Sequence, residues 1–268
     1  MLHKEYEKTI SDHFQNELLV KLLIEQLRPK VYLSLLESGN SRLFLSRIGG
    51  TPIVPKGKKS FIESQGNSMS FIGLLNCADL SKYHDELLFP SEGYLMFYCD
   101  LKDMESQIVF YEKDKNNLIA FTPVSDESIL LENEIVFKQG MSIPPFGSDV
   151  YKKEIEIPAY EKGIDIDMIQ YMDLERELSG GTDHNILGLP YGLQQDPSYF
   201  WAANYLDSDE EIIIEKERNE FYLLLQVNIA DDTLGLDIDR VEAMLYFGIH
   251  KKDLIQKKFS NTLLVHQI

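Results

Sequence analysis

FIGLLNCAD, residues 71–79, aligns without a gap with LLLQVNIAD, residues 223–231, and both stretches end in Asn-x-Ala-Asp. Each stretch is a continuous apolar run, which is typical of a buried β-strand. A match of this kind between two parts of one chain indicates an internal repeat. Short apolar strands also resemble one another by chance, and chance similarity is the alternative explanation.

Features around the two stretches recur in the same order. Each stretch follows a Gly-x-Pro triplet and precedes an aromatic strand pattern, at 50–52 and 95–98 in the first case and at 188–190 and 244–247 in the second. The connecting segments differ in length, so a duplication would be an old one. We predict two related halves, residues 31–160 and 161–268, that arose by duplication.

Most of the chain after residue 30 has the pattern of β-strands. Alternating or continuous apolar segments predict strands at 31–36, 42–47, 69–76, 93–100, 107–112, 117–123, 128–137, 150–158, 221–230, 243–249 and 261–267. The loop KDKNN at 113–117 is typical of a hairpin, so we expect the strands beside it to pair. Many neighbouring strands are too close in sequence for a helical crossover, which favours antiparallel pairing.

Helical patterns lie at the amino terminus and between the strands. Residues 1–27 carry a leucine stripe and predict one helix, which Pro29 ends. Residues 167–178 predict a second helix, with Asp167 as its N-cap and Gly180–Gly181 as its stop. Shorter helices are expected at 78–88, capped by Asp79, and at 197–206.

The chain has the length and composition of a globular domain. With 268 residues, 44% of them hydrophobic, it can form a substantial core. We assign it to the α+β class: a mainly antiparallel sheet in two related halves, with an N-terminal helix and a few peripheral helices. Residues 1–268 are expected to form this single domain.

The charge is strongly negative and unevenly distributed. The net charge is −18, yet residues 1–60 carry 10 Lys or Arg against 6 Asp or Glu, and residues 61–268 carry 16 against 38. A potential of this sign repels nucleic acid and anionic lipid. It favours a basic protein partner, or serves only solubility.

Three further features point to the cytoplasm. No apolar run is long enough to span a bilayer, and the polar amino terminus has no secretory signal. Two cysteines, Cys77 and Cys99, cannot form a disulfide framework or a multi-thiolate metal site, and we expect both to be reduced and structural.

The stretch IGGTPIVP, residues 48–55, is rich in glycine and proline. It lacks the spacing of a phosphate-binding loop, and its prolines remove amide donors. We interpret it as a buried crossover near the seam between the halves, repeated in reduced form around residues 188–190. The residues assigned to this structural role are Gly49, Gly50, Pro52, Pro55, Gly188 and Pro190.

The candidate site residues cluster around GGTDHNILGLP, residues 180–190. Asp183 or another carboxylate could orient His184 as a base or ligand, and Gln194 and Gln226 are expected to lie close by. The alternative is that His184 only ties the loop by hydrogen bonds. The six histidines form no metal motif, and the Gly-x-Asp-Ile-Asp frames at 163–167 and 235–239 fit no calcium loop, so we expect no metal.

In their order, these motifs resemble the YwqG-like family of bacterial proteins, a domain of unknown function. The matching segments are SRIGGTPIVP (46–55), FIGLLN (71–76), GYLMFY (93–98), HNILGLP (184–190), Gln194, LLLQVN (223–228) and MLYFGI (244–249). The sequence departs from the family pattern at KKSFIES (58–64), at Leu74, where the family has glutamine, and at 235–243, where the family has an acidic Gly-rich segment. A site in relatives at those positions would be altered here.

The resemblance implies a largely β fold in one unit, a cytoplasmic protein and no established catalytic activity or cofactor. We therefore expect a non-enzymatic binding protein whose acidic surface neutralises a basic partner. The alternative is an enzyme or small-ligand-binding protein that uses a polar cleft between the halves. A deep pocket with convergent polar groups and perturbed carboxylates would favour this alternative.

Overall fold

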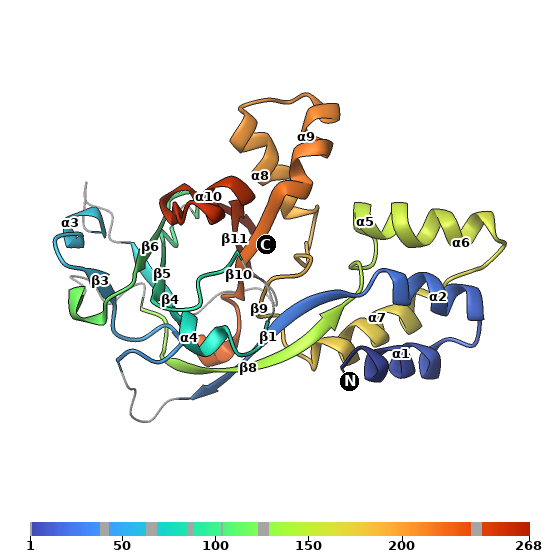
Figure 1. Cartoon of the computed structure of the whole chain (residues 1–268), viewed down its shortest axis with the longest axis horizontal. Helices are drawn as coiled ribbons and strands as arrows, with labels where there is room; N and C mark the ends of the chain where they lie inside the picture. The colour runs from blue at the N-terminus through green and yellow to red at the C-terminus, as the bar shows by residue number, and fades with distance from the viewer. Residues whose placement is uncertain are drawn as a thin grey trace.

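In the part of the chain that the structure describes, ten antiparallel strands form the main sheet of this computed structural model (Figure 1). Their order is β12-β11-β10-β9-β1-β8-β2-β4-β5-β6, so the long strands β1 and β8 are the central pair. The strands are β1 (Arg28–Glu37), β2 (Arg47–Ile48), β4 (Ser70–Asn76), β5 (Tyr94–Cys99), β6 (Gln107–Glu112), β8 (Asn133–Ser142), β9 (Asn185–Ile186), β10 (Phe221–Asn228), β11 (Met244–His250) and β12 (Leu263–Gln267). The structure describes residues 2–37, 43–62, 69–84, 88–102, 104–122, 129–236 and 243–268.

The sheet curls until its edge strands, β6 and β12, approach each other. The side chain of Gln107 on β6 donates a hydrogen bond to the carbonyl of Thr262, just before β12, at 2.8 Å. On the inner face, Phe97 of β5 meets Phe247 of β11 edge to face, with ring centres 5.2 Å apart. The main hydrophobic core is therefore enclosed by a nearly barrel-shaped sheet.

The strands on the two sides of the central pair occupy corresponding places. β4 and β10 are each the second strand outward, and their pairing is interrupted at the same point of the alignment, Phe71/Gly73 in β4 and Leu223/Leu225 in β10. The terminal residues Asn76 and Asn228 each accept a hydrogen bond from the backbone N–H two residues later. The aligned stretches thus have the same position, irregularity and ending.

Different elements cover the outer face on the two sides. They are β3 (Ile53–Pro55), β7 (Leu118–Ala120) and α3 (Lys59–Ile62) on the β4 side, and α8 (Pro197–Leu206) and α9 (Glu211–Glu217) on the β10 side. Gly248 of β11 makes room for α8, because a Cβ atom there would collide with the Trp201 ring. Further short helices are α4 (Cys77–Leu80) and α10 (Lys251–Ile255), with 3-10 turns at Lys115–Asn117, Arg218–Glu220, Asp232–Leu234 and Phe259–Asn261.

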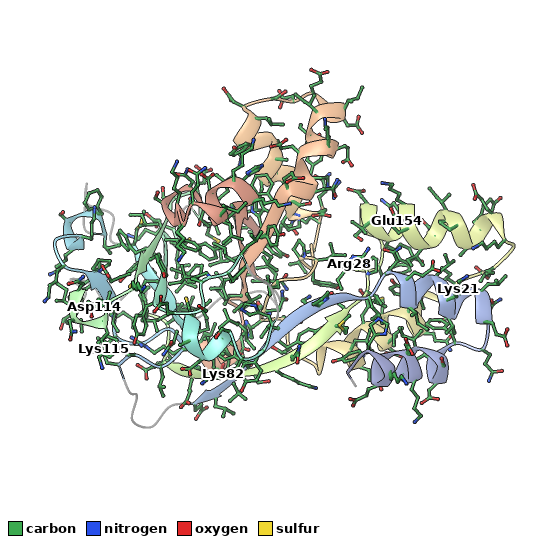
Figure 2. All side chains as sticks on the ribbon, in the orientation of Figure 1. Lys21, Arg28, Lys82, Asp114, Lys115 and Glu154 are labelled. Carbon is green, nitrogen blue, oxygen red and sulfur yellow. The ribbon has the colours of Figure 1, made fainter. Side chains whose placement is uncertain are left out.

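A separate helical layer lies at the end of the molecule where β1 starts and β8 finishes (Figure 1). Its elements are α1 (Leu2–His13), α2 (Glu17–Glu25), α5 (Asp149–Tyr151) continued through a π-helical turn (Lys152–Glu156) into α6 (Ile157–Glu161), and α7 (Met168–Ser179). Their apolar faces share a core of their own, which includes Ile10, Leu23, Ile155, Tyr171 and Leu174. Figure 2 shows Lys21 and Glu154 in this layer, Asp114 and Lys115 at the opposite end, and Arg28 between them.

Most predicted elements are confirmed. They are the strands at 31–36, 69–76, 93–100, 107–112, 221–230, 243–249 and 261–267 and the helices at 167–178 and 197–206. Asp167 caps α7 by accepting from the N–H of Gln170, and Gly180 ends it in the left-handed region with φ of 65°. Both cysteines are buried in the main core, and burial raises the pKa of the Cys77 thiol to about 12.

The prediction of one helix over residues 1–27 is wrong. The chain turns at residues 14–16, and the Asn16 side chain starts α2 by accepting from the N–H groups of Leu18 and Leu19. Pro29 does not stop a helix, because α2 already ends at Glu25 and Pro29 is the second residue of β1. Of the helix predicted at 78–88, residues 85–87 lie outside the described residues, and the helical part of the rest is α4, which Asn76 rather than Asp79 caps.

The strand predicted at 150–158 is helical. Ser148 caps its start by accepting from the N–H of Tyr151, and the buried residues Tyr151, Ile155 and Ala159 recur at every fourth position. That spacing places them on one face of a helix, and Tyr151 and Ile155 pack in the core of the helical layer. Alternation of Ile with charged residues favoured a strand in the sequence, but tertiary packing selects the helical period.

Three further strand predictions need correction. Of the predicted strand 42–47, residue 42 lies outside the described residues, and only Arg47 of residues 43–47 is in a strand, because residues 43–45 turn beneath its guanidinium, which donates to Leu43 O at 2.6 Å. Residues 118–120 form β7, which pairs with β3 instead of making a hairpin with β6. The strand predicted from residue 128 begins at Asn133. Residues 237–242, with the second Asp-Ile-Asp frame, lie outside the described residues.

Candidate functional site

A polar cleft of about 360 Å³ lies between α7 and the sheet. Its walls come from β1, the end of β8, α7, the segment leading into β9, and β10. The polar side chains that line it include Lys30, Tyr32, Ser142, Glu175, Asp183 and Gln226.

Lys30 is the most unusual residue of this cleft, because its side chain is buried with only 7% of its surface exposed. Its Nζ atom donates to the carbonyl of Leu189 at 3.2 Å and lies 5.4 Å from the centre of the Tyr32 ring. Among the described residues, no carboxylate oxygen lies within 4.0 Å of Nζ. Gly188 packs on the aliphatic stem, since a Cβ atom there would lie 3.1 Å from Lys30 Cγ.

Glu175 faces the same cleft from α7. It lies beside the buried stripe of Tyr171, Leu174 and Leu178, so the helix carries it toward the sheet. One carboxylate oxygen accepts from the N–H of Phe146 at 3.0 Å. Burial raises the pKa of Glu175 to about 7, against the opposing effects of this hydrogen bond and of Lys30. Burial also lowers the pKa of Lys30 to about 8, opposed by Glu175 and Asp183.

Ser142 ends β8 on the face of the sheet that carries Lys30. It pairs with Arg28, while Lys30 pairs with Gly140, so the two side chains are diagonal neighbours. Gly140 leaves space for the Tyr32 ring, whose hydroxyl donates to Met141 O at 2.9 Å. The Ser142 hydroxyl is buried and has no hydrogen-bond partner within the described structure.

Two of the four residues predicted as a site, Asp183 and Gln226, line the cleft. The Gln226 side chain accepts from the N–H of Tyr191 at 2.9 Å and donates to the carbonyl of Asp183 at 2.8 Å. The Asp183 carboxylate accepts from the Asn228 side chain at 3.4 Å. These bonds fix the wall of the cleft and leave the Asp183 carboxylate exposed at its edge.

His184 lies behind this wall and is 3% exposed. Its Nδ1 atom accepts from the backbone N–H of Asn228 at 3.2 Å, so Nε2 carries the proton and donates to Asp231 at 3.0 Å. This bond is the main reason that the pKa of Asp231 is far below its ordinary value. In the other half, the hydroxyl of Ser46 accepts the corresponding N–H, that of Asn76, at 2.9 Å. The geometry therefore matches the loop-tying alternative for His184.

Gln194 is placed apart from the cleft. Its backbone N–H donates to the Gln267 side chain at 3.1 Å, and its own side chain donates to the carbonyl of Ile268 at 2.8 Å. It therefore holds the segment before α8 to the end of β12. Gln194 does not line the cleft with Asp183 and Gln226.

The two Gly-Pro segments each follow a short strand: residues 49–52 lead from β2 to β3, and residues 187–190 lead from β9 toward α8. Gly49 and Gly50 have φ of 70° and 77°, and their N–H groups donate to Ile72 O and Leu130 O, both at 2.9 Å. Pro52 precedes β3 and Pro55 ends it, and the carbonyl of Pro52 accepts from the N–H of Phe121 at 3.2 Å. The second segment repeats this backbone: Leu187 and Gly188 have φ of 62° and 68°, and Pro190 follows.

Lys30, Ser142 and Glu175 were not predicted as site residues. For two of them the sequence contains a sign, a charged residue on an apolar face. Lys30 alternates with Tyr32 at the start of an apolar strand, and Glu175 interrupts the apolar stripe of its helix. Ser142 carries no such signal. Within the described residues, no three His, Cys, Asp or Glu side chains gather as a metal site requires. No helix among them is long and apolar enough to cross a membrane.

The fold and the cleft together define an α+β protein with a nearly closed antiparallel sheet and a polar hollow between that sheet and a helical layer. The chain belongs to the family described as Domain of unknown function (DUF1963), whose model matches residues 46–267. The match begins after β1, so Lys30 lies outside it, while Ser142 and Glu175 lie inside. No similar sequence was found among curated proteins.

Proposed function

We propose that this protein binds a small polar molecule in the cleft beside α7, with Lys30 as its main recognition residue. The observation that carries this proposal is a buried lysine, without an ion pair in the described structure, that opens into a cavity. Lysine is almost never fully buried unless it is paired. A free binding site accounts for such a residue better than a structural role does.

The energetics support a ligand. An unpaired buried charge is destabilising by several kcal/mol, and apolar residues of similar volume commonly give a more stable protein. Perturbed titrating groups in a cleft are also characteristic of functional sites. We propose binding in preference to catalysis. A catalytic pair would have the Lys30 amine as nucleophile and the Glu175 carboxylate as base, but no hydrogen bond joins the two groups in the described structure.

The test is a thermal-shift screen of small metabolites against wild-type protein and the Lys30→Met variant. The control is Lys115→Met, which removes an exposed lysine at the opposite end of the molecule from the cleft. Hits should raise the melting temperature of the wild type and of the control but not that of Lys30→Met. Equal shifts in all three proteins, or no hits at millimolar concentrations, would contradict the proposal.

A second candidate function is binding of a basic protein. Its support is the excess of 38 acidic over 16 basic residues in the segment 61–268, which steers a cationic partner toward the surface and disfavours nucleic acid and anionic membranes. Such an association weakens with salt, because screening acts within about 8 Å at physiological ionic strength. Capture of a defined basic protein that is equally strong in 50 and 500 mM salt would contradict a charge-driven partner.

We also propose that the chain is a cytoplasmic, YwqG-like member of its family whose halves, residues 31–160 and 161–268, arose by duplication. The ordered motifs support the first part. The corresponding strand order and the bulges at aligned positions support the second. An experimental structure with the two bulges at unrelated positions would argue against duplication.

A further inference from the structure

We infer that the molecule bound in the cleft carries a carboxylate, whose oxygens accept hydrogen bonds from Lys30 and Ser142. This inference rests on the proposed function and adds the chemical class of the ligand. It concerns the floor of the cleft, where both side chains leave the same face of the sheet from adjacent strands.

The floor holds hydrogen-bond donors that the described residues do not satisfy. Lys30 Nζ has three protons and one acceptor, Leu189 O, and the buried Ser142 hydroxyl has no partner. Both side chains are more than nine-tenths buried. Buried polar groups are nearly always paired, so the missing partner in this place is an acceptor.

The opposite wall explains why the ligand is an acid and not an amine. One Glu175 oxygen already accepts from Phe146, and Asp183 accepts from Asn228. Both carboxylates thus have a donor, whereas the Ser142 hydroxyl has no partner and Lys30 Nζ has only the Leu189 carbonyl. A carboxylate complements the charge of the Lys30 ammonium and can also accept from the Ser142 hydroxyl. Both would be charge-assisted hydrogen bonds, which are stronger than those between neutral groups.

The rest of the ligand is small and partly apolar. Ile143, Met172 and Leu178 contribute apolar surface to the walls. The cleft volume of about 360 Å³ is at the lower end of the range for ligand pockets and limits the ligand to a small molecule. An aryl or short alkyl carboxylate fits this space.

Binding of an anion here should be linked to protonation of Glu175. A carboxylate beside Lys30 is repelled by ionised Glu175, so the complex forms best when Glu175 is neutral and Lys30 is charged. The charged and titratable groups that face this pair from the surrounding elements are Tyr32, Lys138, Tyr151, Tyr171, Arg176, Asp183 and Tyr191. With a pKa of about 7 for Glu175 and about 8 for Lys30, affinity should be highest near pH 6 and fall as the pH rises.

The test is calorimetric titration of the full-length protein with benzoate and hexanoate at pH 6.0 and 8.5, with benzamide and benzylamine as uncharged and cationic counterparts. Both carboxylates should bind at pH 6.0 and at least about tenfold more weakly at pH 8.5, because the competent fraction of the protein falls. Lys30→Met should abolish binding, Ser142→Ala should weaken it several-fold, and Glu175→Gln should keep it and remove the part of the pH dependence near pH 7. The exposed-site control Lys115→Met, at the opposite end of the molecule, should behave as the wild type.

The outcomes separate this inference from the proposed function. If benzamide or benzylamine binds as well as benzoate and Lys30→Met abolishes that binding, the cleft is a ligand site and the carboxylate inference is wrong. Carboxylate binding that does not weaken between pH 6.0 and 8.5 also overturns it. If no probe binds and the metabolite screen gives no hit, both proposals fall. Melting temperatures of the variants without ligand show that each one is folded.

Discussion

Replacing Lys30 by methionine should stabilise the folded protein at neutral pH, and the gain should shrink in alkali. Burial lowers the pKa of Lys30 from 10.5 to about 8. At 1.36 kcal/mol per pKa unit, this shift means that the charged form is destabilised by about 3 kcal/mol in the folded state. Methionine has a similar length and no charge, so Lys30→Met should raise the free energy of unfolding by about that amount at pH 7.

The sign of the pH dependence follows from proton counts. Between pH 8 and 10.5 the unfolded chain keeps the Lys30 proton and the folded chain does not, so the free energy of unfolding of the wild type rises with pH. Glu175 acts below this window: its pKa, raised from 4.5 to about 7, makes stability fall as the pH rises between those values. Glu175 is only partly buried, so solvent reduces its effect. Together the two groups contribute a stability minimum near pH 7 to 8.

The assay is urea unfolding at pH 6, 7, 8, 9 and 9.5, followed by the fluorescence of the single, buried Trp201 and by circular dichroism. The difference between Lys30→Met and wild type should fall from about 3 kcal/mol at pH 7 to about 1 kcal/mol at pH 9.5. The control Lys115→Met should follow the wild type at every pH. A difference that is independent of pH, or a Lys30→Met variant that is less stable at pH 7, would refute the reasoning.

Three further substitutions, the first with a glycine control, test the folded framework by urea unfolding. The measurements are made at pH 7 unless another pH is given. Gly49→Ala should lower stability by about 3 kcal/mol, because φ is 70° and the new Cβ would lie 2.7 Å from Leu130 O, whereas Gly57→Ala, with φ of 79° and open space around it, should cost only about 1 kcal/mol. His184→Ala should cost about 2 kcal/mol, because it leaves the buried N–H of Asn228 unpaired, but should not change ligand binding in the cleft. It should also flatten the loss of stability below pH 4, since Asp231, whose lowered pKa stabilises the protein above that pH, loses its main partner. Arg218→Met should cost about 3 kcal/mol at any salt concentration, because it leaves the buried carboxylate of Asp196 without its guanidinium partner.

The fold was predictable from sequence where one physical signal dominated. The continuous apolar runs at 71–76 and 223–228 have no alternative to a buried strand, and α7 has both its cap and its stop written in the sequence. The segment 150–158 satisfies both periods, because Ile155 and Ile157 alternate with charge while Tyr151 and Ile155 are four apart. The choice between the two periods depends on packing against the other helices of the layer, which is tertiary structure and is not encoded locally.

The candidate site was predictable only where it coincides with a motif. Asp183 and Gln226 belong to matched motifs or lie beside them, and both line the cleft. Lys30 and Glu175 belong to none, and 144 residues separate them in the chain. Their shared position in the cleft depends on how α7 packs against the sheet, which no local pattern predicts. A charged residue inside an apolar stripe is the only local sign that such a residue faces a cavity.

The corresponding strand positions on the two sides of the central pair give a physical reason for the location of the cleft. Asn185 pairs with Gln226 on one side and Tyr32 on the other, and all three residues line the cleft. The corresponding row in the first half has Arg47 at the place of Asn185, between Leu74 and Glu134.

Arg47 fills the space that the shorter Asn185 leaves open. Its guanidinium is buried, donates to the carbonyls of Leu43 and Thr51, both at 2.6 Å, and lies 5.4 Å from the Phe71 ring. Leu74 packs in the apolar cluster beneath β3 and β7, where a glutamine would need hydrogen-bond partners. The row is therefore closed by a long side chain on this side of the sheet and open on the other. The open row supports the α7 side as the place where we propose that a ligand binds, and Leu74 lies away from that cleft.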